Sequence, residues 1–192
     1  MKALVSIVAL ALAGCTSLAP RSDPQAIFFA KLTTLCGQAF EGRIASPPAA
    51  ADASFTGKTM VMHVRECSRD TIRIPFHVGE DRSRTWVITR TSKGLRLKHD
   101  HRHADGSEDI QTQYGGDTLA PGTAFRQEFP ADAYSKALFV RGNIPQSASN
   151  VWALELLPVP VFAYELRRPS RHFRVEFDLS RPIAAPPAPW GA

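Results

Sequence analysis

The feature that most constrains the fold is an alternation of apolar and polar residues with a period of two. Residues 72–78 read Ile-Arg-Ile-Pro-Phe-His-Val, and residues 60–64 and 173–179 repeat the pattern. Because successive side chains of a β-strand point to opposite faces, this alternation predicts antiparallel strands with one buried and one solvated face. His63 and His77 fall on the polar positions, so we expect them to face solvent.

Further segments with strand character follow one another along the chain, at residues 40–44, 84–90, 95–103, 110–114, 124–129, 151–157 and 162–167. Turn signals such as Gly94, Gly106 and the pair Gly115-Gly116 separate them. Short connections pair sequential strands, which predicts an all-β antiparallel meander. We expect it to close into a single lipocalin-like barrel of about 8–10 strands, with a sandwich as the alternative.

One short helix is expected at the start of this domain, which spans residues 23–181. Asp23 offers an N-cap and Pro24 suits the first helical position. Phe28 and Leu32 then share one helical face, and Gly37 can end the segment. This apolar face is expected to pack on the barrel or to plug it. A second helical turn is expected within residues 131–138.

A leading helix, a first strand bearing Gly42 after Gly37, and an antiparallel meander together resemble the lipocalin-type barrel. The Gly-x-Trp signature of lipocalins is absent, since Gln38 and Ala39 follow Gly37. The resemblance therefore implies a barrel and leaves the ligand open.

The first residues predict export. After Met1-Lys2 comes an apolar stretch that is too short to span a membrane as a mature helix, and Leu12-Ala13-Gly14-Cys15 follows. This motif resembles the lipobox of bacterial lipoproteins. The resemblance implies that residues 1–14 are a signal peptide, that Cys15 carries the lipid, and that residues 15–22 are a tether. Thr16 after the cysteine implies the outer membrane, facing the periplasm. The alternative is an ordinary signal peptide in which Cys15 is incidental.

Composition and cysteine usage narrow the function classes. The chain has 23 basic and 18 acidic residues, a net charge of +5, and its Lys and Arg form no run. We therefore expect no nucleic-acid partner.

Export favours a disulfide between Cys36 and Cys67, with two buried thiols as the alternative. Residues 182–192 form a Pro- and Ala-rich tail, expected to lie outside sheet and helix.

Half of the six histidines lie within five residues, at His99, His101 and His103. They follow Leu95 and Leu97 on the same face of a predicted strand, which directs them along the inner face toward a barrel mouth. With Glu108 as a fourth ligand, they would suit a divalent metal such as zinc, manganese, iron or nickel.

The same segment resembles the first motif of cupins, with Gly94, then His101 and His103, then Glu108 and Gly115. The gap from Gly94 to His101 is one residue too long, and no second cupin motif follows. The resemblance implies a metal-dependent enzyme or metal sensor. The alternative is that Asp100 and Arg102 pair across strands while the histidines hydrogen-bond at a polar barrel end.

No complete catalytic set is present, because the serine-hydrolase elbow, phosphate loop, dinucleotide fingerprint and His-Glu-x-x-His motif are all missing. Aromatic side chains at Trp86, Trp152, Phe162 and Phe173 are candidates to line or fill the barrel. The leading hypothesis is a lipid-anchored envelope protein, not an enzyme, that binds a small hydrophobic ligand or another envelope protein. The metal-dependent reading of the histidines is the alternative.

Overall fold

The computed structural model describes residues 23–192, so Cys15, the signal peptide and the tether lie outside the described residues. The strands are β1 (Ala39–Ile44), β2 (Met60–His63), β3 (Glu66–Cys67), β4 (Thr71–Val78), β5 (Asp81–Thr91), β6 (Gly94–His101), β7 (Tyr114–Asp117), β8 (Arg126–Pro130), β9 (Val151–Leu157), β10 (Val161–Arg168) and β11 (Arg171–Ile183). The helices are α1 (Pro24–Thr33) and α2 (Ala133–Arg141), with 3-10 turns η1 (Ala50–Asp52) and η2 (Pro145–Ser149). Among residues 23–192, no helix is long and apolar enough to cross a membrane.

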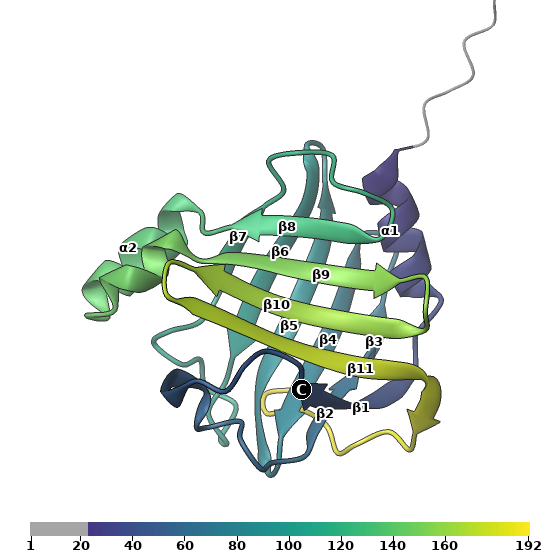
Figure 1. Ribbon diagram of the computed structural model, residues 1–192, viewed down its shortest axis with the longest axis horizontal. Helices are drawn as coiled ribbons and strands as arrows, with labels where there is room; N and C mark the ends of the chain where they lie inside the picture. Colours follow the sequence, from purple (N-terminus) through teal and green to yellow (C-terminus); the bar gives the residue numbers. More distant parts are fainter. Residues whose placement is uncertain (1–22) are drawn as a thin grey trace, which may run out of the picture.

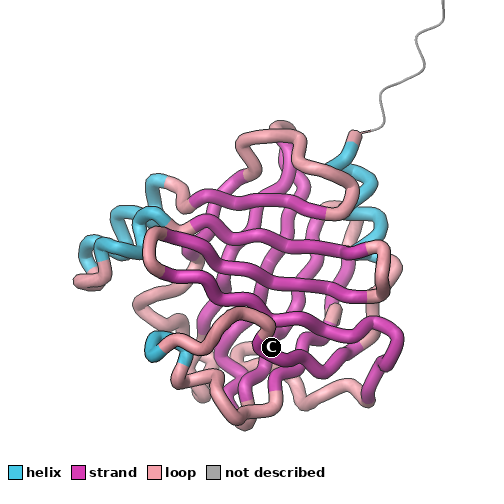
Figure 2. Tube along the Cα trace, in the orientation of Figure 1, coloured by secondary structure: helices cyan, strands magenta, loops and turns pink. Residues whose placement is uncertain are grey.

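All strands belong to one antiparallel sheet with the order β7-β6-β5-β4-β2-β1-β11-β10-β9-β8, and β3 pairs with β4. In Figures 1 and 2, strands β8 to β11 form a front layer that crosses the back layer of β4 to β7, and helices lie at both ends. The sheet is nearly closed into a barrel. The predicted all-β antiparallel meander is therefore confirmed.

The remaining seam lies between β7 and β8, where the start of α2 completes the closure. The backbone N–H of Asp132 donates to the carbonyl of Gly115 at 2.9 Å, and the Ser135 hydroxyl bonds both the N–H and the carbonyl of Gly115. A side chain at Gly116 would overlap the carbonyl oxygen of Pro130. Gly116 thus lets β8 approach β7 more closely than a larger residue would allow, and Gly115 does the same for β6, where a side chain would overlap the Leu97 carbonyl.

This seam corrects one expectation from the sequence. Gly115-Gly116 is not a turn after a strand at residues 110–114, because the pair lies inside β7. The other predicted strands are present. Strand β11 also runs beyond residue 181: Pro182 pairs with Phe40, past the point where pairing with β10 ends at Asp178. Proline is tolerated there because the strand has a neighbour on only one side.

One end of the barrel is plugged by α1, as predicted. The Asp23 side chain caps the helix by accepting from the Gln25 N–H at 2.9 Å. Phe28 and Leu32 are fully buried in the hydrophobic core. The Gln25 side-chain amide donates to the Thr118 hydroxyl at 2.8 Å, which joins the helix to the residue after β7. Figure 1 shows α2 at the opposite end of the barrel.

A disulfide joins Cys36 and Cys67, as the sequence predicted, and excludes the alternative of two buried thiols. It ties the segment after α1 to β3.

The expectation that His77 faces solvent is wrong. This side chain is buried on β4, where it lies opposite Val61 of β2, and burial lowers its pKa.

Candidate functional site

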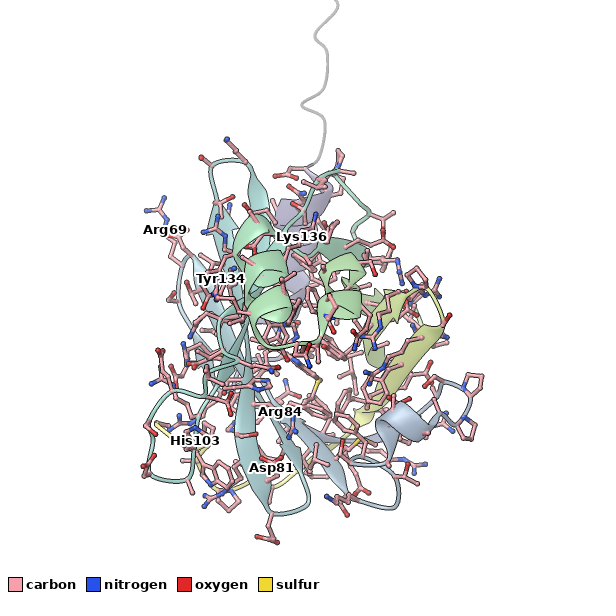
Figure 3. The ribbon with its side chains drawn as sticks, turned by 90° about the vertical axis from the view of Figure 1, so that its left-hand side faces the viewer. Arg69, Asp81, Arg84, His103, Tyr134 and Lys136 are labelled. Carbon is pink, nitrogen blue, oxygen red and sulfur yellow. A yellow bond between two sulfur atoms is a disulfide. The ribbon has the colours of Figure 1, made fainter. Side chains whose placement is uncertain are left out.

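A cavity of about 210 Å³ opens at the end of the barrel that α1 leaves free. Its lining comes from the ends of β4, β5, β6, β7, β9, β10 and β11 and from the segments around η1, α2 and η2. Figure 3 faces this end, with Arg84 below α2 and Asp81 beneath it at the rim. The lining combines stacked aromatic rings, two histidines and three arginines.

The aromatic rings form a preassembled surface. Trp86 stacks on Tyr164 with ring centroids 4.5 Å apart and an interplanar angle of 11°. Phe76 stacks on the same indole, 4.7 Å away at 18°. Three of the four aromatic residues singled out in the sequence, Trp86, Trp152 and Phe173, line the cavity. Phe162 fills the barrel core instead, fully buried against Trp86 and Phe177.

His99 is buried on the inner face of β6, and both of its ring nitrogens have partners. Nδ1 lies 3.1 Å from the Tyr114 carbonyl and Nε2 lies 2.9 Å from the Tyr164 hydroxyl. Since a carbonyl only accepts, Nδ1 carries the hydrogen and Nε2 accepts from Tyr164. Burial lowers the pKa of His99 to about 3, with a smaller contribution from His101. The imidazole is therefore neutral at physiological pH.

His101 continues the same face toward the mouth. Its Nε2 lies 3.1 Å from the hydroxyl of Tyr114. Burial, and next the charge of Arg84, lower the pKa of His101 to about 4. The predicted inward direction of His99 and His101 is correct, and both are neutral hydrogen-bonding groups of the cavity wall.

The structure does not bring His103 and Glu108 to this wall. Strand β6 ends at His101, and His103 lies in an exposed turn closed by a bond from its N–H to the Ser107 carbonyl at 2.8 Å (Figure 3). Glu108 instead forms an ion pair with Arg102 at 3.0 Å. The expectation that His103 shares the inner face is wrong because β6 ends at His101 and the turn begins at His103.

Asp100, on the outer face of β6, pairs with Arg73 of β4 and with Arg102, both at 2.8 Å. This is the arrangement that the sequence offered as the alternative to a metal site. In the part of the chain that the structure describes, no three His, Cys, Asp or Glu side chains are placed to hold a metal ion.

The arginines of the mouth were missed by the sequence analysis. Arg84 pairs with Asp81, and Arg171 pairs with Asp52 at 2.6 Å. Arg168 donates to two neutral oxygens instead. The only signal in the sequence was the Arg168-Pro-Ser-Arg171 turn, which indicates a hairpin but not that both arginines point to the barrel mouth.

Comparison with known proteins adds no relative: no family model, no curated protein and no solved structure matches this chain. The function must therefore be argued from the cavity and from the first residues of the sequence.

Proposed function

We propose that this protein is an exported, lipid-anchored binding protein of the cell envelope, and that a small molecule occupies the cavity at the open end of its barrel. The observation that carries the proposal is the cavity itself, about 210 Å³ of space lined by ordered aromatic and polar side chains. Ligand sites are typically concave, largely apolar and furnished with a few oriented polar groups.

The hydrogen bonding of the wall supports a preformed site. Tyr164, His99 and Tyr114 hold one another in fixed orientations, and the Trp86 ring is stacked between Phe76 and Tyr164. Side chains that are already ordered lose little conformational freedom when a ligand binds, which favours affinity.

The position of the cavity also suits an anchored protein. The described chain begins at Asp23 beside α1, whereas the cavity lies at the α2 end (Figure 1). An anchor at Cys15, as the lipobox resemblance implies, would therefore be attached on the side of α1 and would leave the mouth accessible.

Nuclear magnetic resonance of the indole N–H groups tests this binding role. The neutral probe benzyl alcohol is expected to shift the signals of Trp86 and Trp152, which line the cavity, in a saturable manner. Trp190 lies in the C-terminal tail and provides an internal control. No saturable shift of the two cavity indoles with any small aromatic probe would contradict the proposal.

Two variants test whether the probe binds in this cavity. Ile144 lines the cavity, so Ile144→Trp should fill it and abolish the shifts. Val140 is 61% exposed on α2 and does not line the cavity, so Val140→Trp should leave them intact.

A further inference from the structure

Arg168 is the guanidinium at the mouth whose charge has no acidic partner. Its Nη1 donates to the Ser147 hydroxyl and to the Asn150 side-chain oxygen, each at 3.2 Å. Among residues 23–192, no carboxylate lies within ion-pair distance of Arg168, and its Nε and Nη2 make no hydrogen bond. The edge formed by Nε and Nη2 is the one that a planar carboxylate can engage with two parallel hydrogen bonds.

The charged side chains that line the cavity are all positive. Three guanidinium groups line it, and two of them are neutralised by Asp81 and Asp52. Within the described chain, no Asp or Glu is part of the lining. The two histidines of the wall are neutral, so Arg168 is the lining charge without a paired carboxylate, and Asp52 and Asp109 act on this end of the barrel from outside the lining. A concave site with low-dielectric walls concentrates the field of such a charge and attracts anions.

The size and shape of the cavity restrict the rest of the ligand. A dry cavity of about 150 Å³ accommodates benzene, so 210 Å³ suits one aromatic ring with a short substituent. A large polycyclic ring system or a long acyl chain would exceed it. Phe76 and Tyr164 cover both faces of the Trp86 indole. The apolar surface left for such a ring is therefore the edge of this stack together with the partly buried Phe55 and Ile144 of the lining.

We infer that the ligand is a small monocyclic aromatic acid whose carboxylate is bound by Arg168 at the mouth and whose ring lies against the aromatic wall. This inference rests on the proposed binding function and names the chemical class of its ligand. Ser147 and Asn150 hold the Arg168 side chain through Nη1 and leave its other edge for the carboxylate.

Calorimetric titration of the intact purified protein with three probes tests the inference. Phenylacetate is expected to bind at least about tenfold more tightly than the neutral isostere phenylacetamide, because a hydrogen bond between charged groups is stronger than one between neutral groups. Phenyl phosphate should bind more weakly than phenylacetate, since its larger tetrahedral group has less room in a cavity of about 210 Å³, although an arginine edge can engage either anion with two hydrogen bonds.

Two variants with the same chemical change test whether Arg168 causes the preference for phenylacetate over phenylacetamide. Arg168→Gln should weaken phenylacetate binding about tenfold or more and leave phenylacetamide binding unchanged. Arg167→Gln removes the adjacent charge on the outer face of β10, where Glu165 keeps Arg126, Arg174 and His172 as partners. This control should bind phenylacetate like the wild type.

The outcomes separate this inference from the function on which it rests. Equal affinity for phenylacetate and phenylacetamide, or tighter binding of phenyl phosphate than of phenylacetate, would overturn the inference that the ligand is an aromatic acid. The proposed binding function would still stand. The same holds if Arg168→Gln and Arg167→Gln behave alike. If none of the three probes nor benzyl alcohol binds, both the inference and the proposed function fail.

Discussion

The hydroxyl of Tyr164 donates a 2.9 Å hydrogen bond to Nε2 of His99, deep inside the barrel. The Tyr114 carbonyl holds the opposite nitrogen of the same ring at 3.1 Å. A protonated His99 would carry a hydrogen on Nε2, so the Tyr164 hydroxyl would have to turn and accept. Burial and this hydrogen-bond pattern both favour the neutral ring.

Stability should therefore fall in acid. The pKa of His99 is lowered from 6.5 to about 3 in the folded protein, so the unfolded chain binds more protons between these values. Stability is undiminished above pH 6.5 and falls as the pH drops toward 3, by up to about 1.4 kcal/mol per pH unit for this residue. Urea unfolding at pH 7 and pH 5 should show a smaller difference for His99→Gln than for the wild type. The same difference in unfolding free energy between pH 7 and pH 5 for His99→Gln and the wild type would contradict this prediction. Titration of the His99 ring near pH 6.5 would also contradict it.

The seam of the barrel should be intolerant of a side chain. Gly116→Ala places a methyl group against the backbone carbonyl of Pro130, which cannot move without shifting β8, so we expect a loss of about 3 kcal/mol in unfolding free energy. Gly142→Ala is the matched control, because its closest neighbour is the flexible amide end of Gln111. The control should cost less than about 1 kcal/mol. Similar losses in both variants, measured by urea unfolding, would argue against the tight approach of β7 to β8.

The disulfide should contribute substantially to stability. Cys36 and Cys67 are 31 residues apart, and closing a loop of this length removes about 3–4 kcal/mol of conformational freedom from the unfolded chain. The double variant Cys36→Ala/Cys67→Ala should unfold at correspondingly lower urea concentration while the fold persists. Reduction of the wild type should reproduce the change, and an unaltered midpoint in both experiments would refute it.

Attachment to the membrane should depend on the Cys15 side chain. Cys15→Ser is expected to move the protein from the membrane fraction to the soluble fraction, because the lipobox resemblance attaches the lipid at this residue. Mass spectrometry of the wild-type N-terminal peptide should find Cys15 as the first residue with acyl chains. Thr16→Ser is the control and should remain in the membrane fraction. A wild-type protein that is soluble after export would exclude the anchor.

The sequence predicted the strands wherever one face is buried and the other polar, as in β2 and β11, because burial imposes the period of two. It failed at β7, since glycines carry no side chain and the close packing that requires Gly116 is visible only when β8 is in place. His103 was misplaced for a local reason: β6 ends at His101, two residues before the last histidine, and His103 is the first residue of the turn.

The site was only half predictable. His99 and His101 follow buried leucines on one strand, so their inward direction could be derived from alternation. Arg84, Arg168 and Arg171 come from strand ends and a hairpin that meet only in the closed barrel. No local pattern distinguishes Arg168 from Arg167, although one lines the cavity and the other lies on the outer face.

A crystal structure of the protein grown with saturating phenylacetate tests the central claim most directly. We expect the ring in the cavity, against Trp86 and Tyr164, with its carboxylate at the Nε and Nη2 edge of Arg168. A cavity that holds only water under these conditions, or that the protein's own side chains fill, would contradict a ligand-binding barrel.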